Sequence, residues 1–169
     1  AQEADLDTRV RMQAVSLATV MLGQGIAFDQ QGSELLRSKS FTRDSYDSGD
    51  WFNRVDYSLQ DNNYNVGMPR SSDDGSNYDI IARVKDAVAT PGETELKQMT
   101  AFYQELTALR KSSPLFTLGD GATVMKRVDF RNTGADQLTG LLVMTIDDGM
   151  QAGASLDSRV DGIVVAINA

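Results

Sequence analysis

The chain has 169 residues, of which 41% are hydrophobic and 24% charged, and it carries a formal net charge of −8. The composition is that of a globular protein, and no run approaches the roughly 18 to 20 apolar residues that a membrane span needs. Because excess negative charge repels phosphate backbones, we expect no nucleic-acid partner.

Two chemically important residue types are missing. The chain has no cysteine, which excludes disulfides, thiolate metal sites and cysteine nucleophiles. It has no histidine, which excludes the serine-hydrolase triad and His-ligated zinc from this chain. Any catalysis by these residues would have to use carboxylates, tyrosine or lysine, and we expect no organic cofactor.

Helix and strand patterns alternate at the start of the chain. Apolar residues recur at helical spacing over residues 7–22, which predicts a helix with one buried face that Gly23 can end. The short apolar run 26–28 lies between glycines and predicts a buried strand of a parallel sheet. The start and the apolar last residues suggest a segment of a longer chain.

The periodicity then disappears over residues 29–77, apart from a short turn of helix around 32–39. Irregular loops longer than about 12 to 15 residues are usually functional or disordered. Aromatic side chains supply enough apolar area to hold a loop in place, which argues against disorder. These aromatics are Phe41, Tyr46, Trp51, Phe52, Tyr57 and Tyr64. We therefore expect an ordered functional loop.

Two further helices are predicted after the loop. The first covers residues 77–89, with Ile80, Ile81, Val84 and Val88 on one side. The second follows a predicted capping box, with Thr90 as N-cap, Pro91 at the first position and Glu93 as the box glutamate, and it ends before Pro114. We expect its apolar stripe to pack on the strand at residues 26–28. The stripe comprises Leu96, Met99, Phe102, Tyr103, Leu106 and Leu109.

Beyond Pro114 the pattern changes to strands only. The segments 122–132, 139–147 and 162–169 are short, rich in Val, Ile and Leu, and separated by turn residues. A change from alternating helices and strands to strands alone predicts a domain boundary near residues 113–118.

Residues 40–57 form the candidate site. A loop that follows a parallel strand lies at its carboxyl end, where α/β barrels carry their active sites. Carboxylate, amide and guanidinium groups hydrogen-bond pairs of sugar hydroxyls and aromatic rings stack on pyranose faces, so the mixture fits an uncharged oligosaccharide. The candidate residues are Arg43, Asp44, Tyr46, Asp50, Asn53 and Arg54. The alternative is that they only hold the loop together through Asx turns and ion pairs.

Two Asp-Gly clusters, residues 71–77 and 146–162, are candidates for calcium, which prefers oxygen ligands. Neither matches the spacing of an EF-hand loop, and ordinary turns are the alternative. Glycosidase chemistry needs two carboxylates that flank the scissile bond. Spacing alone nominates no such pair.

Several motifs resemble the α-amylase family, glycoside hydrolase family 13. The apolar run into Gly32 and Glu34 resembles its last barrel strand, and residues 102–116 are similar to its final barrel helix. More specific is a resemblance to the pullulanase and limit-dextrinase branch, and within it to type I pullulanases, over the whole chain. The matching positions are Glu34, Arg37, Lys39, Ser45, Tyr46, Gly49, Asp50, Asn53 and Asp56.

The resemblance implies an α/β fold in two parts. Residues 1–113 would be the last strand-helix units of a (β/α)8 barrel, with the long loop after the last strand. Residues 114–169 would be the first strands of a C-terminal antiparallel β-sandwich. The family's catalytic carboxylates follow earlier strands, so no catalytic residue is expected here, and this chain alone should be inactive.

The resemblance also implies a function for the complete protein. It would hydrolyse α-1,6-glucosidic linkages in pullulan, amylopectin and limit dextrins with retention. Its partners would be an α-glucan and the remainder of the same polypeptide, its location secreted or at the bacterial cell surface. Asp44 would reach sugar hydroxyls, whereas Asp50, Asn53 and Arg54 would shape the loop. The alternatives are a non-catalytic carbohydrate-binding or structural module and a calcium-dependent adhesin.

Overall fold

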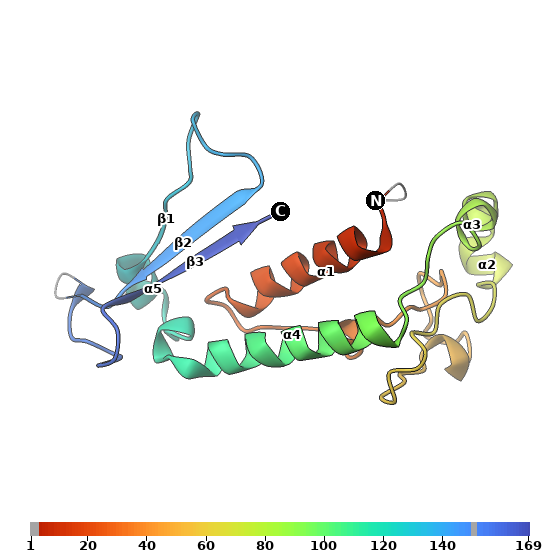
Figure 1. The fold of residues 1–169 in the computed structure, drawn as a ribbon, viewed down its shortest axis with the longest axis horizontal. Coiled ribbons are helices and arrows are strands. Elements are labelled where there is room, and N and C mark those ends of the chain that lie inside the picture. The colour runs from red at the N-terminus through yellow and green to blue at the C-terminus, as the bar shows by residue number, and fades with distance from the viewer. Residues whose placement is uncertain (1–3, 150–151) are drawn as a thin grey trace. The chain divides into compact units, whose positions relative to one another are not determined.

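The computed structural model describes residues 4–149 and 152–169, which fall into two compact units. The first unit comprises the chain up to residue 13 together with residues 30–103, and the second comprises residues 14–29 and 104–169. Figure 1 shows two long helices, α1 (Leu6–Met21) and α4 (Glu93–Ser112). Each contributes residues to both units. Within the described ranges, no helix is long and apolar enough to cross a membrane.

The first unit is mostly irregular chain with short helical turns. In order these are η1 (Ser33–Leu35), η2 (Asp50–Phe52), α2 (Ser71–Asp74), η3 (Gly75–Asn77) and α3 (Tyr78–Val84). Apolar side chains from the turns and from α4 are buried: Leu35, Phe52, Ile81, Leu96 and Met99. The long loop is therefore ordered by its own apolar anchors, although α3 ends earlier than predicted and Ile80 is half exposed.

At the start of each long helix, a carboxylate accepts a hydrogen bond from a backbone N–H group that has no partner within the helix. At α1, the Asp5 carboxylate accepts from the Thr8 N–H at 2.7 Å, and this backbone bond is the main reason that the pKa of Asp5 is lowered. At α4, the Glu95 carboxylate accepts from the Gly92 N–H at 2.8 Å. The predicted box at Thr90 and Glu93 is thus wrong by two residues, because the helix begins only at Glu93.

The apolar stripe of α4 is only partly as predicted. Leu96, Met99 and Leu106 are buried, but Leu109 is 44% exposed. The predicted strand at residues 26–28 is not formed, and Ile26 and Phe28 are 93% and 91% exposed. Packing of α4 on these two side chains is therefore wrong for this chain. A parallel strand needs neighbouring strands for its backbone N–H and C=O groups, and the described residues supply none there.

In the second unit the end of α1 is held by an arginine from α4. The Arg110 guanidinium donates to the Met21 and Gly23 carbonyls, both at 2.7 Å, and to the Gly25 carbonyl at 2.6 Å. The last carbonyls of a helix have no partner inside it, and a cation there also complements the helix dipole. Arg110 thus provides hydrogen-bond donors for backbone carbonyls at the carboxyl end of α1 and holds the turn that follows the helix.

The rest of the second unit is a helical turn, a short helix and a sheet. Pro114–Phe116 (η4) and α5 (Gly121–Arg127) precede three strands, β1 (Val128–Phe130), β2 (Leu141–Asp147) and β3 (Gly162–Asn168). The strands form an antiparallel sheet in the order β1-β2-β3, visible in Figure 1. Met144 faces Val165 across β2 and β3. Their core also includes Leu115, Phe116 and Ile146.

Two of the three predicted strands are confirmed, and the first is mostly wrong. Residues 121–127 are helical because the Asp120 carboxylate accepts from the Thr123 N–H at 2.9 Å and so caps α5. The β-branched Thr123 and Val124 favour a strand only weakly, so a local cap decides the outcome. Only Val128–Phe130 of that segment joins the sheet.

Candidate functional site

The candidate site is the segment 40–57, and buried polar groups fix its beginning. Ser40 is fully buried, donates its hydroxyl to the Gly67 carbonyl at 2.8 Å and accepts from the Gly67 N–H at 3.3 Å. The neighbouring Phe41 ring meets the Tyr64 ring edge to face, with centroids 5.1 Å apart. The segment therefore starts from a rigid point.

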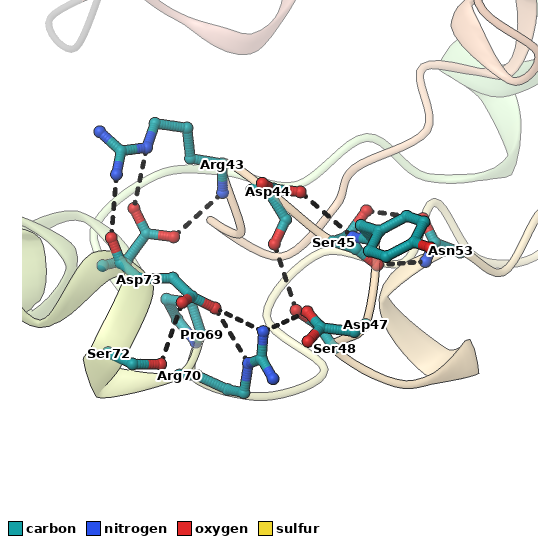
Figure 2. A network of polar contacts seen from close by, with 12 residues as sticks. Arg43, Asp44, Ser45, Asp47, Ser48, Asn53, Pro69, Arg70, Ser72 and Asp73 are labelled. Carbon is teal, nitrogen blue, oxygen red and sulfur yellow. Dashed lines mark hydrogen bonds and ion pairs between the residues drawn. The ribbon is translucent and has the colours of Figure 1, made fainter.

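Asn53 closes the middle of the segment into a loop (Figure 2). The buried Ser45 donates its hydroxyl to Asn53 Oδ1 at 2.7 Å, and Asn53 Nδ2 donates to the Ser45 carbonyl at 3.0 Å. Lys39 Nζ donates to the same Ser45 hydroxyl at 2.9 Å. Three residues of the sequence motif thus form one hydrogen-bonded unit.

Arg43 is tied to α2 rather than free for a ligand. Its backbone N–H donates to Asp74 Oδ2 at 3.1 Å, its guanidinium donates to the Asp73 carbonyl at 2.9 Å, and Nε lies 3.7 Å from Asp74 Oδ1. The Asp74 side chain is almost fully buried. Because a buried carboxylate needs its partners, Arg43 is held to the second half of the loop.

Arg70 makes a second pair of contacts in this region, which Figure 2 shows. Arg70 binds the carboxylates of Asp47 and Asp73, the latter at 2.9 Å, and these hydrogen bonds, with Asp47 first, raise the pKa of Arg70. A hydrogen bond from Ser72 is the main cause of the lowered pKa of Asp73. No pattern in the sequence singles out Asp47 or Arg70, because exposed ion pairs leave no spacing signal.

Asp44 and Tyr46 are exposed candidate residues that lie close together in the chain and make few contacts. Asp44 Oδ1 accepts from the Tyr46 N–H at 3.3 Å, and the Asp44 carbonyl accepts from the Ser48 hydroxyl at 3.2 Å. The Tyr46 ring is 95% exposed. An exposed carboxylate beside an exposed ring is an arrangement that can hydrogen-bond hydroxyls and stack on a sugar face.

Asp50 begins the η2 turn, and Arg54 follows its C-cap residue Asn53. Asp50 is exposed, and its carboxylate makes no hydrogen bond or ion pair with residues 4–149 or 152–169. Arg54 forms a half-exposed ion pair with Asp61 at 3.5 Å. Exposed pairs of this kind contribute little to stability, about 0 to 1 kcal/mol. No described contact of Asp50 supports its predicted role in shaping the loop, and the ion pair of Arg54 supports such a role only weakly.

The family of the chain follows from its sequence. The profile of the C-terminal region of pullulanase-type alpha-1,6-glucosidases matches residues 59–169. The chain belongs to this family.

Relatives of this pullulanase-type region are much longer than the chain. A pullulanase of Klebsiella pneumoniae is 89% identical over 99% of the chain, which spans 15% of that relative. A pullulanase of Klebsiella aerogenes is 99% identical over 90% of the chain, which spans 14% of it. A crystal structure of a Klebsiella pneumoniae pullulanase complexed with maltotriose superposes with a TM-score of 0.95 at 99% identity, covering 99% of the chain and 16% of that structure.

Asp56 is a residue of the sequence motif that lies just before the matched residues 59–169, and its role is local. Its two carboxylate oxygens accept from the Ser58 N–H and hydroxyl, and from the Gln60 and Asp61 N–H groups, at 2.6 to 3.1 Å. The hydrogen bond from the Ser58 side chain, followed by the backbone bonds, lowers the pKa of Asp56 to about 2. Asp56 therefore shapes the end of the segment.

In the two Asp-Gly clusters, several described aspartates are paired with arginines. Across the parts of the chain that the structure describes, no group of three acidic side chains is placed to hold a metal. In the first cluster Asp73 and Asp74 contact Arg70 and Arg43, as described above.

The second cluster is likewise occupied by arginines. The buried Arg127 guanidinium pairs with Asp148 Oδ1 at 2.5 Å, and Arg159 pairs with Asp157 at 2.7 Å. Backbone hydrogen bonds, with the Asp157 N–H first, lower the pKa of Asp148, and the bond from Arg159 lowers that of Asp157. These contacts hold a turn of the pullulanase-type region.

Proposed function

We propose that the chain is part of a starch-debranching glycoside hydrolase that cleaves α-1,6-glucosidic linkages in pullulan, amylopectin and limit dextrins with retention of configuration. The observation that carries this proposal is the family membership of residues 59–169. The pullulanases of two Klebsiella species that share 89% and 99% identity with the chain support it.

The proposed place of the chain is at the end of the catalytic barrel. Residues 1–113 would supply the last strand-helix units and the long loop, and residues 114–169 the first strands of a β-sandwich. The amphipathic helices α1 and α4 and the antiparallel order β1-β2-β3 are compatible with this division. The exposed Ile26 and Phe28 would join a sheet formed with the remainder of the polypeptide.

The segment 40–57 would form one wall of the glucan cleft. Asp44 and Tyr46 would contact sugar, because they are accessible, whereas Arg43 and Asn53 are engaged in contacts that hold the loop. The maltotriose bound to a pullulanase 99% identical to this chain supports an α-glucan oligosaccharide as the ligand.

The location of the complete protein would be extracellular or at the cell surface, which fractionation of the producing bacterium tests.

Two samples test the proposal. The complete protein should release reducing ends from pullulan, and the chain of 169 residues should not, because glycosidase chemistry needs two catalytic carboxylates and the family resemblance places these after earlier barrel strands. A complete protein that leaves pullulan intact would contradict the enzyme function. Hydrolysis by the isolated chain above a buffer blank would contradict the division of roles, and maltotriose binding without hydrolysis by the complete protein would favour a binding module.

A further inference from the structure

A cavity of the first unit stands outside the candidate glucan site. It has a volume of about 410 Å³ and lies between the start of α1 and the segments 30–37, 62–64 and 89–91. Polar side chains dominate its wall, namely Arg9, Gln13, Gln30, Arg37, Asn62 and Tyr64. The volume falls in the range of roughly 300 to 1,000 Å³ that is usual for small-molecule sites.

The charge of the cavity is opposite to that of the chain. Its described wall contains two arginines and no Asp or Glu, whereas the chain as a whole has a formal charge of −8. Most arginines of the described residues pair with an aspartate: Arg11, Arg43, Arg54, Arg70, Arg127, Arg131 and Arg159. Arg9 and Arg37 form no such pair with the residues that the structure describes.

The two guanidinium groups are held only by backbone carbonyls. Arg9 Nη2 donates to the Ala89 carbonyl, and Arg37 Nη1 donates to the Asn53 carbonyl at 3.1 Å. Arg9 Nε is buried and has no hydrogen-bond partner among the residues that the structure describes. A buried N–H donor without a partner is costly, and a guanidinium binds a carboxylate or phosphate through paired N–H groups.

Arg37 is positioned by a glycine. Gly32 has a φ of +97°, and a Cβ built on it would lie 2.8 Å from Cβ, Cδ and Nε of Arg37. The Arg37 N–H also donates to the Gly32 carbonyl at 2.9 Å. The arginine stem therefore fills the space that a side chain at residue 32 would occupy, and its guanidinium is preorganised at the cavity wall.

We propose that this cavity binds a small anion that carries a carboxylate or phosphate group, with Arg9 and Arg37 as its charged partners. The amide groups of Gln13, Gln30 and Asn62 supply further donors along the wall. The anion neutralises the charge of the two guanidinium groups. This site uses none of the residues assigned to the glucan, so its test is independent of pullulan hydrolysis.

Calorimetric titration of the complete protein with inorganic phosphate and, separately, with citrate tests the site at constant ionic strength. Both anions should bind, and the one that binds more tightly shows whether the site prefers a phosphate or a carboxylate group. Arg9→Met and Arg37→Met remove the charge and keep much of the apolar stem, so each should weaken binding about 10-fold to 100-fold. Arg11→Met is the matched control, because Arg11 lies on the same helix, is exposed and pairs with Asp7. It should bind like the parent.

A second measurement uses the parent protein and does not depend on whether the variants fold. Crystals of the complete protein soaked in sodium selenate should show anomalous density between Arg9 and Arg37. Equal binding by the parent and both cavity variants would overturn the proposal. So would a cavity filled by a side chain from another part of the polypeptide, or the absence of both calorimetric heat and anomalous density.

Discussion

Ser45 and Asn53 bind each other through two hydrogen bonds, one between their side chains at 2.7 Å and one from the Asn53 amide to the Ser45 carbonyl at 3.0 Å. The segment from Ser45 to Asn53 is thereby closed into a ring whose outer side carries Tyr46, and Asp44 immediately precedes it. The residues that hold the segment and the residues that face solvent are different, which makes their roles separable by mutation.

Asn53→Ala in the complete protein should lower the melting temperature together with activity. The substitution removes both bonds to Ser45 and leaves a buried hydroxyl with fewer partners, a cost of about 1 to 3 kcal/mol in the free energy of unfolding. Differential scanning calorimetry measures it, with Gln104→Ala as control, because Gln104 is exposed on α4. A variant that melts with the control would show that the ring does not need Asn53.

Asp44→Ala should instead lower kcat/KM for branched glucan about 10-fold to 100-fold, or about 1.4 to 2.8 kcal/mol, at an unchanged melting temperature. The physical reason is that its carboxylate makes only one local bond, at 3.3 Å. Steady-state kinetics on pullulan provide the measurement. Asp47→Ala is the matched control, because Asp47 pairs with Arg70 and should affect the kinetics less. Parental kinetics with earlier melting would make Asp44 a structural residue.

Leu106→Ala should destabilise the complete protein by about 2 to 5 kcal/mol, as expected for a large-to-small change in a core. Leu106 is 3% exposed, whereas Leu109 on the same helix is 44% exposed. Leu109→Ala should therefore cost clearly less in this unit. Chemical denaturation of the two variants measures the difference, and equal losses would mean that the buried face of α4 is assigned incorrectly.

Asp56 should make the stability of the first unit depend on pH. Its pKa is lowered from 3.8 to about 2 in the folded protein, so the ionised form is favoured by folding. That contribution is present above the unfolded pKa near 4 and is lost as the pH falls towards about 2.

Urea denaturation at several pH values between about 5 and 2 measures this contribution. Asp56→Asn should be less stable than the parent at the upper end of the range, and the difference should shrink towards the lower end. Asp79→Asn, an exposed substitution on α3, is the control. A constant difference between Asp56→Asn and the parent across the range would contradict the role of the charge.

Local signals in the sequence were sufficient for some elements. The apolar spacing over residues 7–22 and the Val- and Ile-rich runs of β2 and β3 predict those elements, since each pattern matches the period of its own backbone. The motif with Ser45 and Asn53 also indicated the segment that is now seen as a hydrogen-bonded ring. In each case, residues close in the chain carry the information.

Other features depended on contacts that the sequence does not display. Residues 121–127 have strand-like composition, but Asp120 caps them as a helix. The run 26–28 has the composition of a buried strand and is nearly fully exposed, because a parallel strand exists only where its neighbours are present. The sequence by itself determined the family and the amphipathic pattern of the long helices. Only the tertiary structure decided that Arg43 is bound by Asp74, and that Arg9 and Arg37 line one cavity whose described wall has no carboxylate. The physical reason is that folding brings these partners together across about 30 to 80 residues of chain.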